Sequence, residues 1–254
     1  MSWFPLYEAA LKGDLAKVTV LLANGEDPNK ASTNGSTPLI IASQEGYLSI
    51  VETLLEKGAD PNKASTNGST PLIIASQDGN LPLVETLLKK GADPNKARTT
   101  TGTTPLYVAS LNGHHPVVLA LLKKGAAVDH ARTNGSTPLY IASQNGHLAV
   151  VQVLLKKGAD PNKANLDGVT PIQAATTPAL ADFMREYDRR NKTMLGIAEL
   201  DNVTRDTDAT LPLDLYEFIG KKNPNGNYVA GRRRKTRKSR KTKKSKKSKK
   251  RRRL

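Results

Sequence analysis

The chain repeats one pattern of apolar and polar positions with a period close to 33 residues. Each unit has a short apolar run after a proline, then a glycine, then leucines and valines at helical spacing, as in Leu48 to Leu55. This spacing predicts two short helices in each unit, the second with a single apolar stripe. The period is marked by Pro5, Pro38, Pro71, Pro105, Pro138 and Pro171, spaced 33, 33, 34, 33 and 33 residues apart. One unit cannot bury its own stripe, so we expect the units to stack on one another.

Polar residues and glycines at fixed places predict where each helix begins and ends. Thr37 precedes Pro38, a pair typical of a helix start, because the threonine can cap the helix and proline lacks an N–H that the first turn leaves unpaired. Gly46 and Gly58 stand where the first and second helices should end. The Asn34-Gly35 pair predicts a tight turn in the loop between units.

Four full units, 34–66, 67–99, 101–133 and 134–166, share this Thr-Pro-Leu core and resemble the ankyrin repeat. The resemblance implies an all-α solenoid of helix-turn-helix units joined by hairpin-like fingertip loops. The histidine usual in the Thr-Pro-Leu-His tetrapeptide is absent, because its place holds residues such as Ile40, Ile73 and Tyr107. We therefore expect these positions to rely on apolar packing.

The units at the two ends depart from the full pattern. Residues 1–33 form a degenerate copy with Phe4 in place of the threonine, and we expect an N-terminal cap on which Trp3 packs. Residues 167–190 form a truncated copy, predicted as a C-terminal cap whose apolar residues run from Pro171 to Tyr187 without a separating glycine. Residues 191–231 are predicted as a linker that contains a short helix at 211–219. The Leu211-Pro212 start of this helix resembles the start of an F-box.

Charge sets the C-terminal segment apart from the rest of the chain. Residues 232–254 hold 17 of the 39 basic residues and no acidic one, so the remainder carries 22 basic and 23 acidic residues. So many like charges with no apolar surface predict a disordered tail. It could act as a nuclear import signal, a nucleic-acid binder, an anchor to anionic lipid or merely a solubilising tail. The residues expected to contact nucleic acid or an import receptor include Arg232, Arg233, Arg234, Lys235, Arg237, Lys238, Arg240, Lys241, Lys249, Lys250, Arg251, Arg252 and Arg253.

The sequence offers no constellation that predicts catalysis. It has no cysteine and four histidines, none in an His-x-x-x-His arrangement, so we expect no metal site and no cofactor. Phosphate-binding and nucleophile motifs are also missing. With no basic and apolar leader at the N-terminus and no long apolar run, we expect an intracellular protein, nuclear or cytoplasmic, that is neither secreted nor membrane-spanning.

Binding is therefore the predicted function. The family resemblance implies that a protein partner binds the concave face, which is made of the fingertips and the exposed side of the first helices. On this chain the expected contacts are Lys12, Asn34, Gln44, Glu45, Asn67, Gln77, Asp78, Arg98, Leu111, Asn112, Arg132, Asn134, Gln144 and Asn145. The leading hypothesis is a monomeric adaptor that holds a protein partner while the tail directs it to the nucleus or to nucleic acid. The alternatives are a nucleic-acid-associated structural protein acting through its tail, and a ubiquitin-ligase adaptor acting through residues 211–219.

Overall fold

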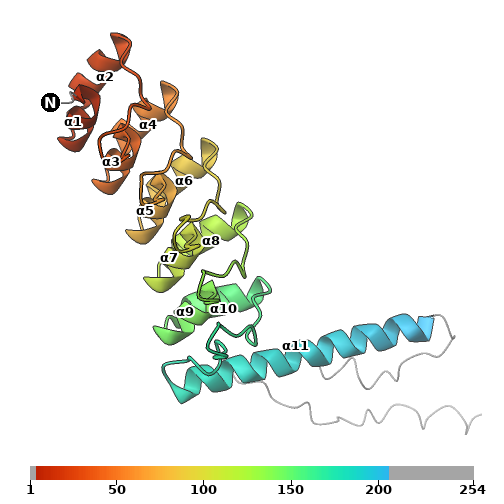
Figure 1. The fold of residues 1–254 in the computed structure, drawn as a ribbon. Coiled ribbons are helices and arrows are strands. Elements are labelled where there is room, and N and C mark those ends of the chain that lie inside the picture. The colour runs from red at the N-terminus through yellow and green to blue at the C-terminus, as the bar shows by residue number, and fades with distance from the viewer. Residues whose placement is uncertain (1–3, 206–254) are drawn as a thin grey trace, which may run out of the picture. The chain divides into compact units, whose positions relative to one another are not determined.

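A computed structural model describes residues 4–205, with side chains as far as residue 193 (Figure 1). This part of the chain contains eleven helices and no strand, which confirms the predicted all-α solenoid. Five helix pairs follow one another: α1 Pro5–Leu11 and α2 Leu15–Ala23, α3 Pro38–Gln44 and α4 Leu48–Glu56, α5 Pro71–Gln77 and α6 Leu81–Lys89, α7 Pro105–Leu111 and α8 His115–Lys123, α9 Pro138–Gln144 and α10 Leu148–Lys156. The last helix is α11, Pro178–Arg205.

The core of the array lies between neighbouring pairs. First helices stack in one row and second helices in another (Figure 1). Leu54, Leu87, Leu121 and Leu154 occupy the same place in successive second helices, and each is 0% exposed. Burying one such side chain stabilises the fold by about 1.5–3 kcal/mol. Stability therefore comes from contacts between copies, as the repeated apolar stripe predicts.

Threonine caps fix the start of each first helix in the full repeats. The hydroxyl of Thr70 accepts a hydrogen bond from the N–H of Ile73 at 3.3 Å, and Pro71 follows at the first helical position. Thr37, Thr104 and Thr137 cap their helices in the same way. Ile73 itself is 0% exposed, which confirms that apolar packing replaces the usual histidine. The predicted threonine caps are confirmed, and each cap stabilises the fold by about 1 kcal/mol.

The truncated copy at 167–190 is divided into a turn and a helix, although no glycine separates its apolar residues. Residues 171–174 form a turn, and the helix begins only at Pro178. A helix that began at Pro171 could not run through Pro178, because proline lacks an N–H and its ring would clash with the preceding turn. Thr177 caps the new start by accepting from the N–H of Leu180 at 3.3 Å. Helix α11 also continues to Arg205, past residue 191, where we placed the start of a linker.

The first turns of α11 pack on the last full repeat. Met184 is fully buried, and the hydroxyl of Tyr187 donates to the carbonyl oxygen of Leu155 at 2.9 Å. These contacts belong to a compact unit that ends at Lys192. Between residues 4 and 205, no helix is long and apolar enough to cross a bilayer. Trp3, the proposed helix at 211–219 and the tail at 232–254 lie outside the described residues.

Candidate binding surface on the concave face

The fingertips stack through their backbones. The N–H of Thr66 donates to the carbonyl oxygen of Asn34 at 3.3 Å, and the N–H of Leu166 donates to that of Asn134 at 3.0 Å. Gly135 makes this approach feasible, because its φ is 81° and a Cβ there would lie 2.7 Å from the backbone nitrogen of Leu166. Fingertip residues are therefore held in register from one repeat to the next.

The three fingertip asparagines that we predicted as partner contacts use their side chains to shape the loop. The side-chain oxygen of Asn34 accepts from the hydroxyl of Ser32 at 2.6 Å and from the N–H of Ser36 at 3.0 Å. Asn67 repeats both bonds, and Asn134 repeats the backbone one. Their carboxamide oxygens are therefore committed to the fold.

Two more predicted contacts tie adjacent repeats together. The side-chain amide of Asn112 donates to the carbonyl oxygen of Gln77 at 2.7 Å, and that of Asn145 donates to Leu111 at 3.1 Å. His114 and His147 contact the same two carbonyls through Nε2, each at 2.9 Å. Sequence reasoning missed these ties, because each joins residues 34 to 37 positions apart.

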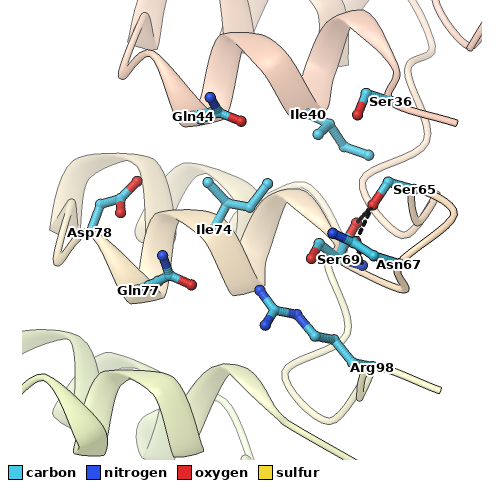
Figure 2. A pocket seen from close by; sticks show the side chains of 10 residues that line it. All are labelled: Ser36, Ile40, Gln44, Ser65, Asn67, Ser69, Ile74, Gln77, Asp78 and Arg98. Carbon is cyan, nitrogen blue, oxygen red and sulfur yellow. Dashed lines mark hydrogen bonds between the residues drawn. The ribbon is translucent and has the colours of Figure 1, made fainter. Parts of the chain in front are cut away.

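A pocket of about 390 Å³ opens on the concave face between the repeats that carry α3 and α5 (Figure 2). Ile40 and Ile74 lie in its middle, with Asp78 toward one end and the fingertip serines toward the other. It brings together five of the predicted contacts with other residues; its lining is Ser36, Ile40, Gln44, Ser65, Asn67, Ser69, Ile74, Gln77, Asp78 and Arg98. A pocket of this size could hold a few side chains of a peptide.

Arg98 reaches into this pocket from the next fingertip, with its guanidinium directed toward Gln77 (Figure 2). Burial lowers the pKa of Arg98, and the positive charge of Arg132 lowers it further, so the two cations interact. The guanidinium of Arg132 lies over the ring of Tyr107, 5.1 Å from its centroid. Burial raises the pKa of the Asp78 carboxyl, an effect that His114 opposes.

The other predicted contacts lie apart from this pocket. Lys12 forms an exposed ion pair with Glu8 at 3.8 Å. Gln144 is exposed at the end of α9 and its carbonyl oxygen accepts from Thr176, whereas Glu45 is exposed beside the pocket and accepts from Gln44. The described residues contain no group of acidic, histidine or cysteine side chains able to hold a metal ion.

A second set of inter-repeat ties runs along the loops that follow the second helices. Asn29, Asn62 and Asn95 each donate to the carbonyl oxygen of the glycine that ends the next second helix, at 3.0, 3.0 and 3.1 Å. Each also accepts an N–H two residues beyond that glycine at 2.7 Å. Asp129 occupies the next place, where it accepts from the N–H of Asp160 but has no amide to donate.

A family model described as ankyrin repeats (3 copies) matches residues 6–98 and 95–165, which together make up more than half of the chain. A search of curated proteins returned no match. Ankyrin repeats form protein–protein interaction domains and are generally non-catalytic. The matched ranges cover the helix pairs and the stacked fingertips of the array, and the chain belongs to the ankyrin repeat proteins.

Proposed function

We propose that this chain is a non-catalytic adaptor that binds a protein partner on its concave face. The observation that carries the proposal is the pocket lined by Gln44, Gln77 and Arg98, where an apolar centre is bordered by exposed polar groups. Small apolar pockets with a few directed polar groups are typical of peptide and ligand sites. The interaction domain is shared with the family; the choice of this face is our proposal.

Two tryptophans placed on the concave face test this choice. Gln44 and Gln77 are exposed at the ends of α3 and α5 and line the pocket. Gln44→Trp with Gln77→Trp fills the pocket without removing a buried apolar contact. We expect affinity capture from the source cells to lose the partner by at least about tenfold, which corresponds to ~1.4 kcal/mol.

A matched control places the same side chains on the second helices. Glu85→Trp with Gln152→Trp changes two exposed residues, on α6 and α10, and capture should remain as for the wild type. Circular dichroism checks that both variants keep their helices. If the control loses the partner and the concave variant retains it, the binding surface is formed by the second helices instead.

We also propose that the basic segment at 232–254 directs the protein to the nucleus or to nucleic acid. Its support is the sequence alone, because the segment lies outside the described residues. Its 17 cations cannot all contact phosphates at once, and about six to ten contacts would give a log–log salt slope of roughly −5 to −9 on duplex DNA. Truncation after Gly231 should abolish this binding and move a fluorescent fusion from nucleus to cytoplasm. An unchanged salt slope after truncation would locate the contact on the repeats.

A further inference from the structure

Two arginines on the concave face, Arg98 and Arg132, have no acidic partner. Neither forms an ion pair or a side-chain hydrogen bond with any residue whose side chain the structure describes, and the Nε atoms of both are buried without an acceptor. A buried donor left without an acceptor destabilises the folded state, because it loses its hydrogen bond to water and gains none in return. The fold therefore accepts a cost at two adjacent positions.

The other arginines with described side chains are treated differently. Arg185, Arg189 and Arg190 all lie on α11, and each pairs with an aspartate or glutamate three or four residues away, at 2.5–2.8 Å. Among the residues whose side chains the structure describes, the arginines without an acidic partner therefore both lie on the concave face. The two are also close enough for the charge of one to lower the pKa of the other.

Nothing in the loop geometry requires arginine at these places. The equivalent residues in the preceding fingertips are Ser32 and Ser65, whose hydroxyls donate within their own loops, each with an asparagine Oδ1 at 2.6 Å and a backbone carbonyl oxygen as acceptors. The N–H at this place closes the loop in all four by donating to a backbone carbonyl oxygen, for example from Arg132 to Ser136 at 3.0 Å, and from Arg98 to Thr103 across a loop that is one residue longer. A serine would thus close the loop and leave no unpaired cation.

We propose that Arg98 and Arg132 form a docking site for an acidic peptide segment of a protein partner, whose carboxylates pair with the two guanidiniums. A guanidinium presents donors in a fork that matches a carboxylate, so a peptide carboxylate can accept from both terminal nitrogens of either arginine. Apolar residues next to the carboxylates would contact Ile74, which is half-buried between the polar ends of the pocket. This inference rests on the proposed concave-face function and specifies the chemistry of the partner.

The charges around the site favour a carboxylate peptide over nucleic acid or a phosphorylated segment. Asp78 lines the same pocket as Arg98, and Glu45 is exposed beside it. These acids repel a doubly charged phosphate more than a single carboxylate. A nucleic-acid strand would also need cations along its whole length, whereas the pocket lining contains Arg98 as its one basic residue.

The test uses the full chain and a reporter in the pocket, because an acidic peptide will also bind the basic tail. The sequence has no cysteine, so Gln77→Cys provides a single attachment point for an environment-sensitive dye beside Arg98. The probe is a blocked peptide of about ten residues, ~33 Å when extended, in which glutamate pairs flank single leucines. Dye emission then reports occupancy of the pocket alone.

In this labelled background, Arg98→Gln with Arg132→Gln should weaken the titration midpoint by about tenfold or more, as expected for lost charge-assisted hydrogen bonds. The matched control, Lys89→Gln with Lys156→Gln, removes two exposed cations from the ends of α6 and α10 and should change the midpoint by less than about twofold. Equal midpoints in the arginine variant and its parent would overturn the proposal, as would a dye that does not respond.

A charge swap separates recognition from folding. Arg98→Glu with Arg132→Glu should bind the same peptide with lysine in place of glutamate, which the parent should not bind. Failure of this swap in a variant with an unchanged melting temperature contradicts the pairing.

Competing ligands are tested with the same dye. If a phosphoserine peptide or a short single-stranded oligonucleotide changes the dye emission at a lower concentration than the glutamate peptide, the site belongs to that ligand and the acidic-peptide proposal is refuted. The two proposals can also fail separately. If the arginine variant loses the dye response but Gln44→Trp with Gln77→Trp still captures the cellular partner, the acidic-peptide site stands and only the general concave-face proposal is refuted.

Discussion

The first two fingertips carry Ser32 and Ser65 where the next two carry Arg98 and Arg132, and a backbone hydrogen bond from this residue closes all four loops, although the loop at Arg98 is one residue longer. Serine adds a hydroxyl hydrogen bond within its loop, whereas the arginine guanidinium has no hydrogen-bond or ion-pair partner among the residues whose side chains are described. The loop forms in both cases. In these loops the backbone bond that all four copies share closes the fingertip, and the side chain that differs between the copies is the one available for recognition.

The strongest test of this division is the apolar position that every full copy shares. Leu87→Ala should lower the free energy of unfolding by about 2–5 kcal/mol, because Leu87 is fully buried between neighbouring pairs and the change leaves a cavity. Denaturant melts followed by circular dichroism measure the loss. Glu85→Ala, an exposed change on the same helix, should stay within about 0.5 kcal/mol. Similar losses in both variants would contradict the stacking of the second helices.

The second test compares two glycines that both have positive φ. Gly58 has open space where a Cβ would lie, whereas a Cβ on Gly135 would lie 2.7 Å from the backbone nitrogen of Leu166. Gly58→Ala should cost about 1–2 kcal/mol for its left-handed conformation alone. Gly135→Ala should cost roughly 1 kcal/mol more, because the neighbouring fingertip must shift. Thermal melts of the pair resolve the difference, and equal losses would show that the fingertips do not constrain each other.

The third test concerns the inter-repeat hydrogen bonds in the loops that follow the second helices. There Asp129 takes the place that Asn29, Asn62 and Asn95 hold in the preceding loops. Asp129→Asn should raise stability by about 0.5–1.5 kcal/mol at neutral pH, because the new amide can donate to the carbonyl oxygen of Gly158. The reverse change, Asn62→Asp, removes the bond to Gly91 and should destabilise by a similar amount. Chemical melts at pH 7 check both signs.

The pH dependence of the Asp129 effect follows from its titration. Burial raises the pKa of Asp129 above 3.8, so the folded state holds this proton more tightly than the unfolded state. The wild type therefore loses stability as pH rises from 3.8 through the raised pKa, and the loss is complete above it. The gain from Asp129→Asn should shrink as pH falls toward 3.8. A gain that stays constant over this range would mean that the carboxylate is not the cause.

The sequence predicted the array because its signals are local and repeated. A capping threonine, a proline and a glycine each act within one helix, so their spacing fixes the helix pairs and the fingertips. The arginines were predicted as contacts because they depart from the repeat, but their lack of acidic partners depends on what the stacked copies bring near them. The inter-repeat amide ties join residues about 30 positions apart, and no local pattern reveals such bonds. The start of α11 was predictable from Thr177 and Pro178, but apolar spacing after Pro171 obscured it.

The smallest expected effect is on the stability of the arginine fingertips themselves. Arg98→Gln with Arg132→Gln removes no ion pair or hydrogen bond within the described residues, only the contact of Arg132 with Tyr107, worth about 0.5–1 kcal/mol. Relief of repulsion between the two cations and removal of two buried donors that lack acceptors offset this loss, so the free energy of unfolding should not fall by more than about 0.5 kcal/mol. Salt should raise the melting temperature of the wild type slightly more than that of the variant, because screening weakens like-charge repulsion.

The matching change in a serine fingertip is Ser65→Ala, which removes the hydrogen bonds of the Ser65 hydroxyl and should cost about 1 kcal/mol. If the arginine variant is the more damaging of the two, the guanidiniums stabilise their loops and are not held free for a partner.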